Sequence, residues 1–218
     1  AEPLAGAATA MKPELLLIDL DDTIYPPSLG LWPLFTERIN TYMRDRVGIP
    51  EHQIAEKRER LFETYGTTMR GLQIEHGIDP HEYLEFVHGI DLSGLIHPDE
   101  KLTDLLSTLA QPKWIFTNAS RKHAENVLGL MGLRAFFIGI IDVMDTAPWC
   151  KPQPEAFEIA LRQVGGVDPR SCLFVDDRPT NLDTARQLGL GTCLVGSAGR
   201  NGHPHVEKLA DLRQVLDL

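Results

Sequence analysis

Short, uninterrupted runs of apolar residues recur along the chain, and most of them are separated by helix-sized intervals. Such runs are typical of parallel strands covered by helices on both faces, because neither face then has room for polar residues. The segments between them carry apolar residues on one side only, which predicts amphipathic helices. This alternation predicts an α/β fold with a doubly wound, Rossmann-like parallel sheet. The predicted strands are 15–18, 114–116, 137–141, 172–175 and 192–195.

The interval between the first two predicted strands spans nearly a hundred residues, too long for a single crossover connection. Its pattern is mostly helical, with predicted helices at 31–47, 50–65, 69–76 and 80–89. We therefore expect an all-helical cap domain over residues 25–97, inserted into a Rossmann-like core formed by 11–24 and 98–218. Residues 1–10 are interpreted as a leader or disordered tail.

Residues that favour helix ends support this division. Ser120 is a predicted N-cap, and Pro154 and Pro179 suit the first turns of two further helices. Gly189 is placed to stop the last of these, and Asp79 is placed to cap the final helix of the insertion. The core is therefore expected to carry helices after the strand runs 114–116, 137–141 and 172–175.

The chain of 218 residues carries 31 acidic and 21 basic side chains, a formal net charge of -10. This balance argues against a nucleic acid polymer or an anionic membrane as partner. Three cysteines without paired spacing favour a reducing, cytoplasmic setting. No apolar stretch approaches the length of a membrane span. A small anionic substrate is compatible with this composition, provided that the binding site itself supplies positive charge. The composition does not indicate an oligomeric state.

Polar and charged residues cluster where the predicted strands end. These residues are Asp19, Asp21, Asp22, Thr117, Asn118, Lys151, Asp176 and Asp177. Strand ends of one parallel sheet share an edge, so the side chains are expected to converge on one site. Acids packed together repel one another, and a cation, a shared proton or a reaction must offset that repulsion.

These residues resemble the four motifs of the haloacid dehalogenase superfamily of phosphatases. Asp19, Asp21 and Thr23 match the first motif, an apolar strand followed by Asp-x-Asp-x-Thr. Thr117 matches the second motif and Lys151 the third, while Asp176-Asp177 match the acidic pair of the fourth. The motifs occur in the family's order, and the insertion lies where this family has a helical cap.

A narrower resemblance is to the pyrimidine 5'-nucleotidase subgroup. It rests on Asp-Leu-Asp-Asp-Thr-Ile-Tyr-Pro from Asp19, on Tyr65-Gly66 followed by Arg70-Gly71-Leu72, and on the segments 116–119 and 150–152. Arg70 is either a substrate contact or a solvated charge on a helix face. The aromatic residues Trp32, Phe35 and Tyr42 are expected to pack within the cap. Four histidines are expected either to pack within the cap or to lie on its surface: His76, His81, His88 and His97.

The residue chemistry agrees with this resemblance. A carboxylate can attack phosphorus in line and form an aspartyl-phosphate, which divides one difficult displacement into two easier ones. Asp19 is the expected nucleophile. Asp21 is expected to protonate the leaving group and then deprotonate the hydrolytic water, a role for which we expect a raised pKa. Lys151 would offset charge on the phosphate and on the nucleophile.

Phosphoryl transfer also gains from a divalent cation, and Mg2+ prefers carboxylate, carbonyl and water ligands. The resemblance implies metal ligands from Asp19, the main-chain carbonyl of Asp21 and Asp177, with Asp176 in the outer shell. It also implies that Thr117 and Asn118 bind phosphate oxygens. Asn181 lies where many relatives carry a second acid, so a hydrogen-bonding role is expected there, and Asp22 is not expected to be a ligand.

The favoured function is a magnesium-dependent phosphomonoesterase acting on a small phosphorylated metabolite, with a pyrimidine nucleoside 5'-monophosphate as a candidate. A sugar-phosphate phosphatase or a phosphomutase could use the same core. A phosphoacceptor signalling or binding module also gathers acids, a Thr and a Lys at strand ends. Against the signalling module, an acidic pair follows Lys151 and a long helical insertion is present.

Overall fold

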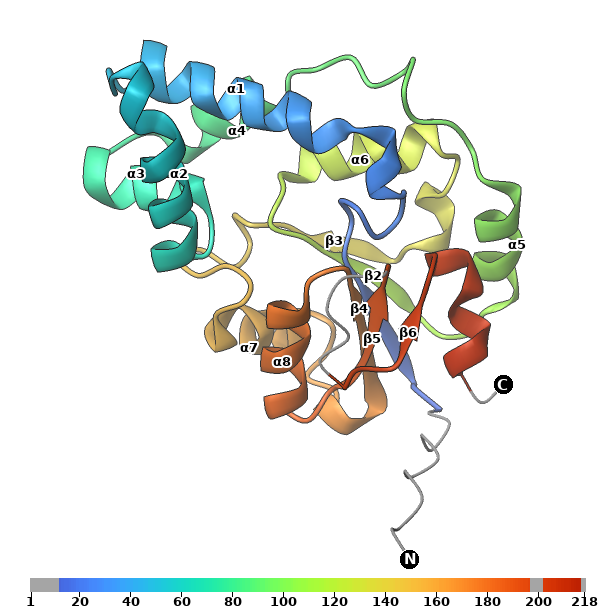
Figure 1. The fold of residues 1–218 in the computed structure, drawn as a ribbon. Helices are drawn as coiled ribbons and strands as arrows, with labels where there is room; N and C mark the ends of the chain where they lie inside the picture. The colour runs from blue at the N-terminus through green and yellow to red at the C-terminus, as the bar shows by residue number, and fades with distance from the viewer. Residues whose placement is uncertain (1–11, 197–201, 217–218) are drawn as a thin grey trace, which may run out of the picture.

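A six-stranded parallel sheet forms the centre of the molecule (Figure 1). The computed structural model describes residues 12–196 and 202–216, so the predicted tail at 1–10 lies outside the described residues. The strand order is β3-β2-β1-β4-β5-β6. The strands are β1 (Leu15–Ile18), β2 (Lys113–Phe116), β3 (Gly139–Ile141), β4 (Cys172–Asp176), β5 (Gly191–Val195) and β6 (His205–Val206). The predicted parallel, Rossmann-like sheet is confirmed.

Strand β1 lies between β2 and β4, and all four of its residues are buried. Successive side chains of a strand point to opposite faces. Leu15 and Leu17 accordingly join one apolar cluster, while Leu16 and Ile18 join the other. Burial on both faces explains why this strand has no alternating polar residues.

Helices cover both faces of the sheet. On one face α7 (Pro154–Gln163) and α8 (Pro179–Gln187) contribute Phe157 and Leu182 to the smaller cluster. On the other face α5 (Glu100–Thr108) and α6 (Arg121–Leu130) contribute Leu105 and Val127 to the larger one. Figure 1 shows the two pairs on opposite sides of the strands. Each pair places one apolar face on the sheet, so the carboxyl ends of the strands are left for the site.

The predicted helix ends agree with the structure. Ser120 accepts a hydrogen bond from the backbone of His123, and Asp79 accepts one from the backbone of His81. Pro154 and Pro179 begin their helices, where the missing proline N–H costs no helical hydrogen bond. Strand β6 was not predicted, because two residues are too few to show a pattern.

Four helices lie between β1 and α5 in sequence: α1 (Leu31–Asp45), α2 (Glu51–Tyr65), α3 (Thr68–His76) and α4 (Pro80–His88). They gather at one end of the molecule as a helical cap, beyond the sheet (Figure 1). Phe35 and Tyr42 are buried there as expected, whereas Trp32 meets the ring of Phe35 edge-on but is 44% exposed. The exact cap limits at 25 and 97 stay a prediction.

None of the helices in the described ranges is long and apolar enough to cross a membrane.

Candidate active site

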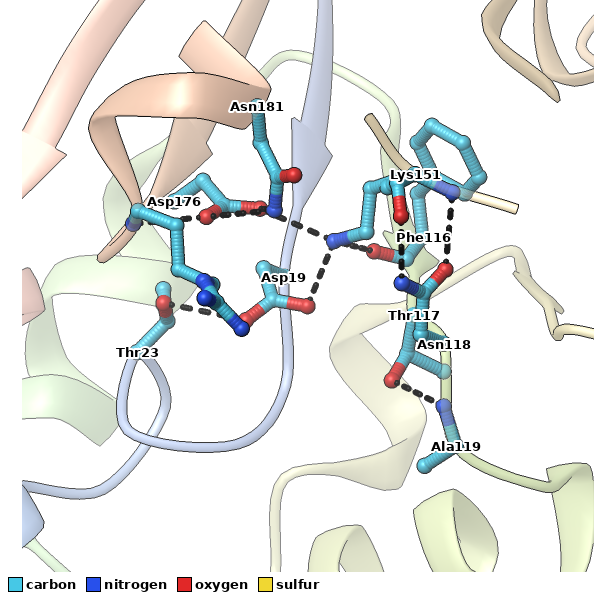
Figure 2. Close-up of polar contacts among 10 residues, drawn as sticks. Asp19, Thr23, Phe116, Thr117, Asn118, Ala119, Lys151, Asp176 and Asn181 are labelled. Carbon is cyan, nitrogen blue, oxygen red and sulfur yellow. Dashed lines mark hydrogen bonds and ion pairs between the residues drawn. The ribbon is translucent and has the colours of Figure 1, made fainter. Parts of the chain in front are cut away.

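The site is organised around the ammonium group of Lys151 (Figure 2). Its Nζ donates hydrogen bonds to Asp19 Oδ1 at 2.7 Å and to Asp176 Oδ2 at 2.8 Å. The third bond goes to the carbonyl oxygen of Phe116, at 2.8 Å. An ammonium group has three donors, so Lys151 is fully satisfied although only 2% of the residue is exposed. Lys151 thus ties together the ends of β1, β2 and β4.

Opposing effects act on these buried charges. Burial alone would lower the pKa of Lys151, but the two carboxylates outweigh it and raise that pKa, so the ammonium stays charged. The pKa of Asp19 is raised by burial, against the lowering effect of Lys151, and nearby Asp176 and Asp177 raise it further. Asp19 therefore sits in a site with more negative than positive charge.

Carboxylate oxygens of Asp19, Asp176 and Asp177 lie within 4.8 Å of one another. Burial and the charge of Asp176 raise the pKa of Asp177 to about 7. An all-oxygen donor set with unbalanced negative charge suits a hard divalent cation such as Mg2+. The residues present therefore fit the cation that the sequence predicted, and Asp22 is not among them.

Asn181, on the first turn of α8, supports this cluster. Its Nδ2 donates to both carboxylate oxygens of Asp176, each at 3.0 Å. The backbone N–H of Arg178 also donates to Asp176, at 2.8 Å. The expected hydrogen-bonding role of Asn181 is confirmed. Together with the bond from Lys151, Asp176 accepts four hydrogen-bond contacts. The carboxylate oxygens of Asp19 and Asp177 accept fewer hydrogen bonds and are therefore more available to a cation.

Thr117 and Asn118 follow β2 beside the same lysine. Asn118 Nδ2 donates to the carbonyl oxygen of Lys151 at 2.8 Å, and its Oδ1 accepts from the Lys151 N–H at 2.9 Å. Thr117 Oγ1 accepts from the backbone of Ala119 at 3.0 Å. The Asn118 amide therefore fixes the backbone that carries Lys151, a contact that its sequence position did not indicate. Phosphate binding by Thr117 and Asn118 stays a prediction.

The surroundings of Asp21 differ from the expectation. Its Oδ1 accepts hydrogen bonds from Tyr25 Oη at 2.5 Å and from His123 Nε2 at 2.7 Å. Burial raises the pKa of Asp21, but His123 and Tyr25 more than offset it and lower that pKa to about 2. The expected raised pKa is wrong, because His123 and Tyr25 stabilise the ionised carboxylate by more than burial disfavours it. A role for Tyr25 and His123 at the site was not predicted. The only signal in the sequence was that each lies a few residues after a motif.

Arg70, on α3 of the cap, is 3% exposed. Its guanidinium donates to the carbonyl oxygen of Val143 at 2.7 Å and to Gln73 Oε1 at 2.9 Å. The interpretation of Arg70 as a solvated charge on a helix face is therefore wrong. Arg70 instead joins the cap to the loop between β3 and α7. Contact between Arg70 and a substrate stays a prediction.

The cap also meets the core beside Lys151. A Cβ atom on Gly66, which ends α2 with a φ of +83°, would lie 2.8 Å from Cys150 Sγ and 3.2 Å from the carbonyl oxygen of Lys151. Both the left-handed backbone and this close approach favour glycine. The site is therefore bordered by the cap on the side of the lysine.

The sequence matches the family model of haloacid dehalogenase-like hydrolases over residues 13–189. This match includes all the motif residues described above, so the protein belongs to the haloacid dehalogenase-like hydrolase family.

Known proteins agree with this assignment. Phosphate metabolism protein 8 of Saccharomyces cerevisiae is 27% identical over 192 residues, which cover 82% of this chain and 60% of the yeast protein. The crystal structure of CbbY from Rhodobacter sphaeroides in complex with phosphate superimposes with a TM-score of 0.66 at 18% identity, covering 94% of this chain and all of CbbY. The crystal structure of YfnB from Bacillus subtilis, bound to magnesium, superimposes with a TM-score of 0.60 at 21% identity. This match covers 95% of this chain and all of YfnB. At these identities the two structures establish the shared fold.

Proposed function

We propose that this protein is a magnesium-dependent phosphomonoesterase that acts through an aspartyl-phosphate on Asp19. The observation that carries the proposal is the Lys151 network, in which a buried ammonium holds one oxygen of Asp19 at 2.7 Å beside two further carboxylates. A fixed nucleophile, a fixed positive charge and an oxygen donor set for a cation are the groups that phosphoryl transfer needs.

In the first step Asp19 attacks the phosphorus atom and the ester oxygen leaves. Lys151 keeps the nucleophile in one orientation and offsets charge on the phosphoryl oxygens. We propose that Thr117 and Asn118, which precede α6, bind those oxygens. Asp21 gives a proton to the departing alkoxide.

In the second step Asp21 takes a proton from water, which attacks the aspartyl-phosphate and regenerates Asp19. The low pKa of Asp21 keeps it ionised in the free protein, ready to accept this proton. A bound phosphate places negative charge nearby and so raises the pKa of Asp21, which favours its protonated form before the first step.

Asp19, Asp177 and the main-chain carbonyl of Asp21 are the proposed ligands of Mg2+, with Asp176 in the outer shell. When bound, this cation would neutralise charge on the phosphoryl oxygens. Asp176, already held by Lys151 and Asn181, keeps Lys151 in place for the same task.

For the substrate we propose a small phosphorylated metabolite, specifically a pyrimidine nucleoside 5'-monophosphate. The short segments around Asp19, Arg70, Thr117 and Lys151 that resemble the pyrimidine 5'-nucleotidase subgroup support this choice. The yeast relative, named for phosphate metabolism, supports phosphate chemistry.

The test is hydrolysis of p-nitrophenyl phosphate by the purified protein with Mg2+. We expect activity that chelator removes and that Asp19→Asn abolishes, because an amide is a far poorer nucleophile. Asp21→Asn is expected to allow slow phosphorylation of Asp19 but to impair turnover. A wild-type protein with no metal-dependent activity on any phosphate ester would refute the proposed function.

A panel of phosphorylated metabolites, ranked by kcat/KM, tests the substrate. A preference for uridine and cytidine monophosphates would support the nucleotidase assignment, whereas a preference for sugar phosphates would contradict it. Arg70→Ala tests the cap contact in the same assay. If Arg70 recognises the nucleotide, the substitution lowers kcat/KM for the nucleotide more than for p-nitrophenyl phosphate, and equal losses would exclude that role.

A further inference from the structure

Two side chains bind the same oxygen of Asp21. Tyr25, four residues further along the chain, and His123, on the first turn of α6, both donate to Oδ1, at 2.5 and 2.7 Å. Within the described ranges, no group donates a hydrogen bond to Oδ2 of Asp21. One oxygen is thus fixed and the other is left for a reacting proton.

His123 is itself held by the cap. Its ring stacks on that of His88, with centroids 4.5 Å apart and an interplanar angle of 16°. The ring of Phe35 meets it edge-on, with centroids 5.3 Å apart. His88 ends α4 and Phe35 lies on α1, so both neighbours come from the helical cap (Figure 1).

These contacts fix the orientation of the imidazole. Because Nε2 binds a carboxylate, it carries a hydrogen and donates. The other ring nitrogen, Nδ1, is buried and has no hydrogen-bond partner among the described residues. The position of the ring is therefore set by the two cap rings and by Asp21. His88 is anchored in turn by Ser120, with Nδ1 and Oγ 3.1 Å apart.

We propose that His123 is a positioning residue for Asp21, and that the cap, through His88 and Phe35, holds His123 in the orientation that this requires. The inference rests on the proposed function, in which Asp21 transfers the proton. A carboxylate fixed through one oxygen presents the other in a defined direction, and proton transfer depends on that geometry. The position of the cap on the core is thereby coupled to the orientation of the Asp21 carboxylate.

The test compares two phosphate esters that need proton transfer to different extents. An alkyl phosphate has a basic leaving group that must be protonated, whereas p-nitrophenolate leaves without that help. We expect His123→Ala to lower kcat/KM about 100-fold for the alkyl ester and less than about 10-fold for p-nitrophenyl phosphate, since general acid catalysis contributes about 100-fold or more. His123→Gln retains an N–H near the position of Nε2 and is expected to recover much of the loss.

His88→Ala tests the cap's part, and is expected to give a smaller loss with the same preference for the alkyl ester. The matched control is Lys122→Ala. Lys122 pairs with Glu85 across the same two helices, α6 and α4, at 3.2 Å, but both side chains are exposed and neither contacts His123 or Asp21. The control is expected to leave the ratio of the two kcat/KM values unchanged.

Equal losses on both esters for His123→Ala would overturn the positioning role. If the alanine variant does not fold, His123→Phe, which keeps a ring between His88 and Phe35 but lacks the donor, takes its place, and equal losses there would overturn the role in the same way. An unchanged ratio in His88→Ala would overturn the coupling to the cap. Both results presuppose an active wild type, so they leave the proposed function intact. An inactive wild type would overturn the proposed function and this inference together.

Discussion

Two hydrogen-bond networks adjoin the end of β1, and they are built differently. The network of Lys151 fixes Asp19 entirely through core residues, and each donor of the ammonium has an acceptor. The network of Asp21 combines core and cap residues, and one ring nitrogen of His123 is left unpaired in the described part of the chain. The nucleophile is thus held by core residues alone, whereas the group proposed to move protons is held partly by His123, whose ring packs against two rings of the cap.

The first network can be broken at its centre. Lys151→Met retains the length of the side chain but leaves Asp19 and Asp176 buried without their cation. We expect the free energy of unfolding at pH 7 to fall by about 3–5 kcal/mol, as for other buried pairs that lose one partner. Urea unfolding measures this, with Lys122→Met as control, because exposed pairs contribute at most about 1 kcal/mol. A Lys151→Met protein as stable as the wild type would show that the buried charges need no compensation.

A smaller change tests the support of Asp176. Asn181→Ala removes the donor that binds both carboxylate oxygens, so the stability should fall by about 2 kcal/mol, the range for hydrogen bonds to charged groups. Thr180→Ala, an exposed position on the same helix, serves as the control in the same denaturation assay. Equal stability of the two variants would mean that Lys151 and the backbone suffice to hold Asp176.

The second network is expected to weaken in acid. Burial, and then the neighbouring His123, lower the pKa of His88 from 6.5 to about 3. Between these values the unfolded chain binds the proton and the folded chain does not, so stability falls as the pH drops through this window. At pH 5.5 the expected loss is about 1 kcal/mol relative to pH 7.5. Denaturation curves of the wild type and His88→Gln should diverge over this range, and parallel pH dependence would contradict the assignment to His88.

The same contrast explains what could be predicted from the sequence. Asp19 and Thr117 directly follow strands, Asp176 ends one, and Lys151 follows β3 after a loop. The carboxyl ends of parallel strands share one edge of the sheet, which brings such positions together. Their convergence was therefore predictable, and so was the grouping of the carboxylates of Asp19, Asp176 and Asp177. The supporting role of Asn181 was also predicted, because the resemblance places Asn181 where many relatives carry a second acid.

The contact of Asp21 with His123 depends on how α6 packs beside the end of β1, which no local pattern encodes. His123 is separated from Asp21 by 102 residues, and a histidine on a helix gives no indication of which side chain it will meet. Arg70 shows the same limit. Its position on α3 was compatible with solvent or with substrate, and only the packing of α3 against the loop at Val143 shows that it is buried.

The three bonds of Lys151 also bear on how the protein acquires activity as it folds. Its partners lie 132, 35 and 25 residues away in the sequence, so no local segment can form the network alone. Contacts of such long range form only once the intervening chain is ordered. A nascent chain that ends before Asp176 would lack the second carboxylate, and the return of activity during refolding should coincide with completion of the sheet rather than with the appearance of its helices.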